Sequence, residues 1–132
     1  MNPNLLRSDE SKEFYSNERC HILELLNNHD TTKPFSIARA RVEPGVTTAW
    51  HRLNDVKEYY YILEGQGFME IGEEPGFEVS KNDIVKIEPN MAQRIKNTSE
   101  EDLIFLAICN PPFTDENYED FDEFQVIKTL KS

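Results

Sequence analysis

The chain has few cysteines and no long apolar run. Its two cysteines, Cys20 and Cys109, stand far apart and outside any paired spacing, so we expect two free, buried thiols. No apolar segment approaches the ~20 residues of a membrane-spanning helix. Residues 1–4 are polar, unlike the basic and apolar start of a secretion signal. The sequence therefore predicts a cytoplasmic protein with no membrane partner.

Positive charge is also scarce. Against 14 Lys and Arg stand 25 Asp and Glu, which gives a formal net charge of −11. Such a chain repels phosphate backbones and anionic lipid, so we expect a small-molecule partner and no nucleic acid. Part of the excess lies in residues 115–123, which contain six acidic residues and no basic one. This run is typical of a solvated segment.

Strand-like segments dominate the sequence. Residues 35–42, 58–64, 68–71, 77–79, 83–87, 91–97 and 103–109 are rich in β-branched, aromatic or alternating apolar residues. The glycines at 65 and 67 predict a hairpin turn between the second and third of these. Residues 20–26 fit a strand or a helix, and any other helix should lie near 11–18 or after 118. Turn signals at roughly eight- to twelve-residue spacing indicate an all-β sandwich or barrel.

The 132 residues accommodate a single domain. We place a β-barrel domain at residues 20–113. A short N-terminal extension, 1–19, precedes it, and an acidic C-terminal tail, 114–132, follows.

With only three histidines in the chain, each can be considered singly. His51 is followed two residues later by Leu53, on the same face of an extended segment, and then by Glu58. With Gly45 before them and Gly65 after, this spacing resembles the first signature of the cupins. Leu53 stands where the family usually has the second histidine of a His-x-His pair.

A second stretch, residues 82–97, is similar to the second cupin signature. Asn82 stands where that signature usually begins with glycine, and Gln93 where it supplies a final histidine. The resemblance implies the cupin double-stranded β-helix, a jelly-roll barrel. More narrowly, the chain resembles the small single-domain cupins that act as polyketide cyclases.

The resemblance implies a metal site in the barrel lumen, formed by His51, Glu58 and Gln93. One imidazole nitrogen and two oxygens suit a divalent Mn, Fe, Ni, Zn or Co ion and leave positions for substrate. The alternative is a cupin that has lost its metal, in which His51 hydrogen-bonds Glu58. A third way to stabilise a buried Glu58 is an ion pair with an arginine, for which we consider Arg39, Arg41 and Arg94.

Strand alternation places Tyr60 and Ile62 on the same face as Glu58, and Ile95 and Asn97 on that of Gln93. We therefore take Glu58 and Tyr60 as candidate catalytic residues. Packing of Tyr60 in the barrel is the alternative.

Three functions remain open on this sequence. The first is a metal-dependent enzyme of non-redox chemistry, an isomerase, cyclase or lyase acting on a small organic molecule. The second is a metal-dependent dioxygenase, and the third a non-catalytic cupin that binds a small molecule or a sugar. The resemblance also implies a homodimer, formed through the apolar segment 20–26.

Overall fold

The computed structural model describes residues 2–122 of the chain. These residues form eleven strands and two short 3-10 helices. The elements are η1 (Glu10–Lys12), β1 (Phe14–Tyr15), β2 (His21–Leu26), β3 (Ser36–Val42), β4 (His51–Leu53), β5 (Lys57–Glu64), β6 (Gln66–Ile71), β7 (Phe77–Ser80), β8 (Ile84–Ile87), β9 (Gln93–Asn97), β10 (Leu103–Asn110), η2 (Asp115–Asn117) and β11 (Tyr118–Asp120).

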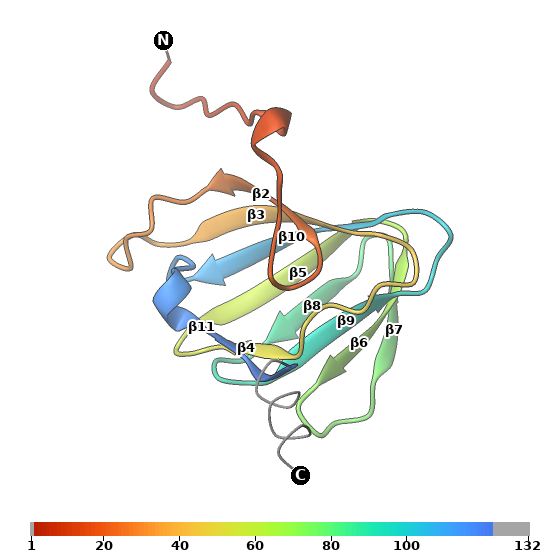
Figure 1. Cartoon of the computed structure of the whole chain (residues 1–132). Coiled ribbons are helices and arrows are strands. Elements are labelled where there is room, and N and C mark those ends of the chain that lie inside the picture. Colours follow the sequence, from red (N-terminus) through yellow and green to blue (C-terminus); the bar gives the residue numbers. More distant parts are fainter. Residues whose placement is uncertain (1, 123–132) are drawn as a thin grey trace.

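The strands build two antiparallel sheets (Figure 1). The first has the order β1-β2-β3-β10-β5-β8, and the second the order β11-β4-β9-β6-β7. The all-β prediction is thus confirmed, and residues 20–26 are a strand. Among residues 2–122, no helix has the length and apolarity needed to cross a membrane.

Alternation along the strands decides which side chains face the interior. In β5, the side chains of Glu58, Tyr60 and Ile62 are buried and their neighbours are more exposed. In β9, Gln93, Ile95 and Asn97 behave in the same way. The faces predicted for both strands are confirmed. Most inward residues are apolar and stabilise the fold by leaving water. Glu58, Gln93 and Asn97 are the polar exceptions in these two strands; Asn97 donates to backbone carbonyls, whereas Glu58 and Gln93 bind each other and point to function.

The predicted hairpin at residues 65–67 is wrong. Strand β5 pairs with β10 and β8, whereas β6 pairs with β9 and β7, so the chain changes sheets at Gly65. Gly65 has a φ of +87°, and a Cβ atom there would lie 2.9 Å from the carbonyl oxygen of Asp102. A glycine is therefore required at this position, but for a crossing between sheets and not for a hairpin.

Strands also form at both ends of the chain, beyond residues 20–113. β1 pairs with β2, and β11 pairs with β4. Of the two regions considered for a helix, the first contains only η1, and residues 123–132 of the second lie outside the described residues. On one side β2 pairs with β3 along most of its length, and on the other β1 covers only its first two residues, His21 and Ile22. The homodimer stays a prediction.

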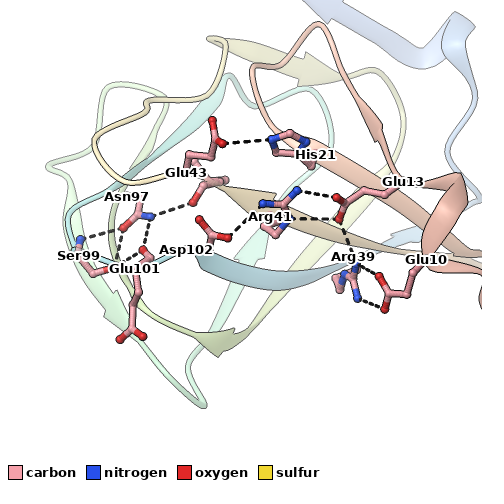
Figure 2. A network of polar contacts seen from close by, with 11 residues as sticks. Glu10, Glu13, His21, Arg39, Arg41, Glu43, Asn97, Ser99, Glu101 and Asp102 are labelled. Carbon is pink, nitrogen blue, oxygen red and sulfur yellow. Dashed lines mark hydrogen bonds and ion pairs between the residues drawn. The ribbon is translucent and has the colours of Figure 1, made fainter.

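An ion-pair network fixes the N-terminal segment on the outer side of the first sheet (Figure 2). The Arg39 guanidinium donates to both carboxylate oxygens of Glu10, at 2.8 and 2.7 Å, and to Glu13 at 3.0 Å. Arg41 donates to Glu13 at 2.6 Å and to Asp102 at 3.1 Å. These hydrogen bonds, those from Arg41 above all, lower the pKa of Glu13 to about 2.

The arginines considered as partners for Glu58 are therefore engaged elsewhere. Arg39 and Arg41 bind the N-terminal segment, and Arg94 donates to Glu70 at 2.9 Å. The expectation that one of them pairs with Glu58 is wrong. These three side chains lie on the opposite strand faces from the inward residues, as the period of two requires.

Candidate functional site

A cavity of about 550 Å³ lies against the first sheet, and segments near both ends of the described chain complete its wall. Strands β2, β3, β5 and β10 contribute to its wall, with Glu58 and Cys109 among the contributing side chains. The N-terminal residues 14–18 contribute as well, together with Phe113 and Tyr118 near the other end of the chain. This volume is in the range of small-molecule binding sites.

Glu58 is the buried acid of this cavity. Its side chain is 5% exposed, and its Oε1 atom accepts a hydrogen bond from Gln93 Nε2 at 2.7 Å. Among residues 2–122, its Oε2 atom has only the thiol of Cys109, at 3.6 Å; Cys109 lies opposite Glu58 in the ladder of β10 and β5. A thiol is a weak donor, so Oε2 keeps acceptor capacity.

Burial raises the pKa of Glu58 to about 7. The charge of Glu18 raises this pKa further, whereas the nearby His51 and the hydrogen bond from Gln93 act in the lowering direction. A carboxyl group with this pKa exchanges a proton readily near neutral pH. This is the property of a general acid or base.

Gln93 links Glu58 to Tyr60. The hydroxyl of Tyr60 donates to Gln93 Oε1 at 2.7 Å, which leaves the Gln93 amide NH₂ to donate to Glu58. The Tyr60 ring packs on Phe105, with ring centroids 4.2 Å apart. Burial raises the pKa of Tyr60 well above 10, so its hydroxyl stays protonated. Within the described chain, Tyr60 does not line the cavity, and it contacts Glu58 through Gln93. Tyr60 is therefore a residue that positions Glu58 through Gln93.

His51 is held by the backbone of a neighbouring residue. Its Nδ1 atom lies 2.7 Å from the carbonyl oxygen of Ala49, and a carbonyl only accepts, so Nδ1 carries a proton. The ring stacks on Tyr118, with centroids 5.3 Å apart. Nε2 lies 3.4 Å from Glu18 Oε1. The expected alternative, a hydrogen bond from His51 to Glu58, is not formed among these contacts, because the ring is bound to Ala49 and faces Glu18.

Sequence reasoning missed Glu18. The backbone N–H of Ala49 donates to the Glu18 carbonyl oxygen at 3.0 Å, so Ala49 holds both Glu18 and His51. Ser16 Oγ accepts from the Glu18 N–H at 3.2 Å. Glu18 reaches the cavity through the path of the N-terminal segment, and no local sequence motif predicts this position.

The metal site predicted from His51, Glu58 and Gln93 stays a prediction. Within residues 2–122, no three His, Cys, Asp or Glu side chains group closely enough to hold a metal ion. Gln93 and Glu58 are in direct contact, and both polar atoms of the Gln93 amide already have partners. His51 stands opposite Gln93 in the ladder of β4 and β9, but its ring is bound to Ala49. Leu53 is buried and offers no ligand atom.

Fold and cavity together define a small double-stranded β-helix with a polar site inside its barrel. The family model described as "Cupin domain" matches residues 38–109, and the chain belongs to this family. An uncharacterized protein of Methanocaldococcus jannaschii is 35% identical over 113 residues, which cover 84% of this chain and 89% of that protein.

Solved structures share the fold at low sequence identity. The Streptomyces protein Pac13, crystallised as a variant with uridine, has a TM-score of 0.72 at 17% identity, covering 90% of this chain and 91% of that one. A predicted oxalate decarboxylase of Thermotoga maritima has a TM-score of 0.66 at 22% identity, covering 83% of this chain and 96% of that one. Both are similar to this chain in fold.

Proposed function

We propose that this protein is an enzyme that transfers protons on a small organic molecule, without a redox step, using Glu58 as general base and acid. The observation that carries the proposal is the placement of this carboxyl group: it is buried on the cavity wall, Gln93 fixes Oε1, and within the described chain Oε2 has only a weak thiol donor. Isomerisation, cyclisation and elimination all need such a group.

The chain's own residues supply each step of such a reaction. Glu58 Oε2 takes a proton from a carbon of the bound molecule and becomes a neutral carboxylic acid. The proton then returns to another carbon in an isomerisation, or to the leaving group in an elimination. The hydrogen bond from Gln93, which is itself fixed by Tyr60, keeps the carboxyl group oriented through both steps.

The comparisons offer support from chemistry on the same fold. Pac13 is described as a nucleoside dehydratase, and dehydration is an elimination. That barrel matches this chain at a TM-score of 0.70 with 15% identity, so the support concerns what a barrel of this size can accommodate.

Proton abstraction can be detected before the substrate is known. We expect the parent protein, incubated with a metabolite extract in D₂O, to add deuterium to one compound or to shift its mass by the loss of water. The Glu58→Gln variant should lose this activity, because an amide cannot accept the proton. Mass spectrometry of the extract provides the readout, with Glu100→Gln, an exposed acid, as the control. If parent and Glu58→Gln give the same spectra, the proposal is wrong.

A second candidate is a metal-assisted form of the same enzyme, with a divalent Mn, Fe, Ni, Zn or Co ion near His51, Glu58 and Gln93. One observation favours it: His51 Nε2 and the Glu18 carboxylate lie 3.4 Å apart, so a cation beside them would find a nitrogen and an oxygen ligand together.

Metal removal separates the two candidates. From the donor geometry, we expect Glu58-dependent exchange to survive dialysis against a chelator, and protein purified without a histidine tag to contain far less than one metal per chain. Metal content is measured by mass spectrometry on the parent, His51→Ala and Gln93→Ala proteins. Near-stoichiometric metal that both variants lose, with exchange that only the metal restores, would instead establish the metal-assisted form. Oxygen uptake with an iron-loaded protein would indicate a dioxygenase, and tight ligand binding without turnover would indicate a binding cupin.

A further inference from the structure

The charges on the cavity wall are all of one sign. Glu18, Glu24, Glu58 and Asp115 line it, and the described lining contains no Lys, Arg or His. Glu24 lies 3.3 Å from His29 and Asp115 is exposed, so Glu18 and Glu58 are the less exposed acids of the wall. A bound anion would be buried beside these carboxylates, which repel it. The wall therefore selects against phosphates and carboxylates.

Glu18 is fixed at the cavity rather than carried on a loose end. Its backbone is hydrogen-bonded to Ala49 and Ser16, and the next residue, Arg19, donates to Asp122 at 2.6 Å. The ion pairs of Arg39 and Arg41 hold the preceding residues on the sheet (Figure 2). Its carboxylate, 22% exposed, thus has a fixed position before any ligand arrives, which lowers the entropic cost of binding.

The Glu18 carboxylate also has unused acceptor capacity. Oε1 lies 3.4 Å from His51 Nε2, an ion-pair distance, and among residues 2–122 Oε2 receives only the Cys20 thiol, at 3.8 Å. A carboxylate accepts about four hydrogen bonds. An ammonium group, with three donors and a positive charge, supplies what these atoms lack.

Aromatic side chains surround the carboxylates. Phe14, Tyr15, Phe113 and Tyr118 line the cavity, together with the apolar Ile22 and Leu53. Aromatic faces attract organic cations, and the apolar surface accommodates a hydrocarbon or ring body. The net charge of −11 adds a long-range attraction for cations.

We propose that the substrate is an organic cation, an ammonium group on an apolar or aromatic body, and that Glu18 binds the ammonium group. This inference rests on the proposed function, because it places the reacting carbon of the same molecule at Glu58. It names the substrate class, and it assigns to Glu18 a role in specificity that is distinct from proton transfer.

Three ligands that differ only in the terminal group test the inference. Tryptamine, tryptophol and indolepropionate present an ammonium, a hydroxyl and a carboxylate on the same indole body. At about pH 8, above the Glu58 pKa of about 7, we expect calorimetry to show tryptamine binding at least about tenfold more tightly than tryptophol, and no measurable binding of indolepropionate.

Variants assign the effect to one carboxylate. Glu18→Gln should weaken tryptamine binding about tenfold and leave tryptophol unchanged, whereas Glu100→Gln, which removes the same charge from an exposed position, should change neither. Equal affinities of the parent for tryptamine and tryptophol, or tighter binding of indolepropionate, would overturn the inference without any variant. The Glu58-dependent deuterium exchange is measured separately, so loss of ammonium selectivity with exchange intact contradicts only the substrate class.

Discussion

Replacing Glu58 with glutamine is expected to stabilise the folded protein at alkaline pH and to leave its stability nearly unchanged in acid. The carboxyl pKa is about 7 in the folded chain and near its ordinary value of 4.5 in the unfolded chain. The folded state therefore holds this proton more tightly. The stabilising contribution of the protonated form is complete below pH 4.5 and is lost as the pH rises through 7. Above pH 7, the ionised, buried carboxylate costs about 3 kcal/mol, which a neutral glutamine avoids.

Denaturant unfolding of both proteins across this pH range measures the effect. The free energy of unfolding of the parent should fall between pH 4.5 and pH 8 relative to that of Glu58→Gln, and the two curves should separate by about 3 kcal/mol at the alkaline end. Glu100→Gln, at an exposed position, controls for the loss of one negative charge. Curves that run parallel throughout would mean that Glu58 is ionised in the fold with an ordinary pKa.

The sequence was sufficient to predict which residues of β5 and β9 face the interior of the barrel. A period of two in β5 and β9, together with the spacing of the cupin motif, placed Glu58, Gln93, Tyr60 and His51 in the interior, and all four are buried. Alternation is a property of each strand by itself. It needs no knowledge of which strands pair, so it can be read from one chain.

Contacts between distant segments could not be obtained in this way. Whether β6 pairs with β5 or with β9 depends on the packing of two sheets, and the glycines at 65 and 67 fit a hairpin as well as a crossing. The partners of Arg39 and Arg41 lie on the N-terminal segment, about thirty residues away. Glu18 reaches His51 by the same path. The metal ligands were likewise predicted from spacing, whereas the hydrogen-bond partners of Gln93 and His51 come from the fold.

The bridge formed by Gln93 should be the most costly polar contact to remove. In Gln93→Leu the side-chain volume is nearly kept, but the Tyr60 hydroxyl loses its acceptor and Glu58 Oε1 loses its donor. Leaving a buried polar group without a partner costs about 1–3 kcal/mol, and more when the group is charged. We therefore expect a loss of about 2–3 kcal/mol near pH 5, where Glu58 is protonated, and of about 4 kcal/mol near pH 8, where it is ionised.

A double-mutant cycle distinguishes the bridge from simple packing. Tyr60→Phe in the Gln93→Leu background removes the unsatisfied hydroxyl, so it should restore about 1–2 kcal/mol, although the same change in the parent destabilises by leaving Gln93 Oε1 without its donor. Urea unfolding of the four proteins at both pH values gives the coupling energy. A positive coupling that persists at both pH values, with the larger cost of Gln93→Leu at alkaline pH, would show that Tyr60 and Gln93 hold the Glu58 carboxylate as one unit. Additive losses, equal at the two pH values, would mean that Gln93 only fills space and that Glu58 is oriented by other contacts.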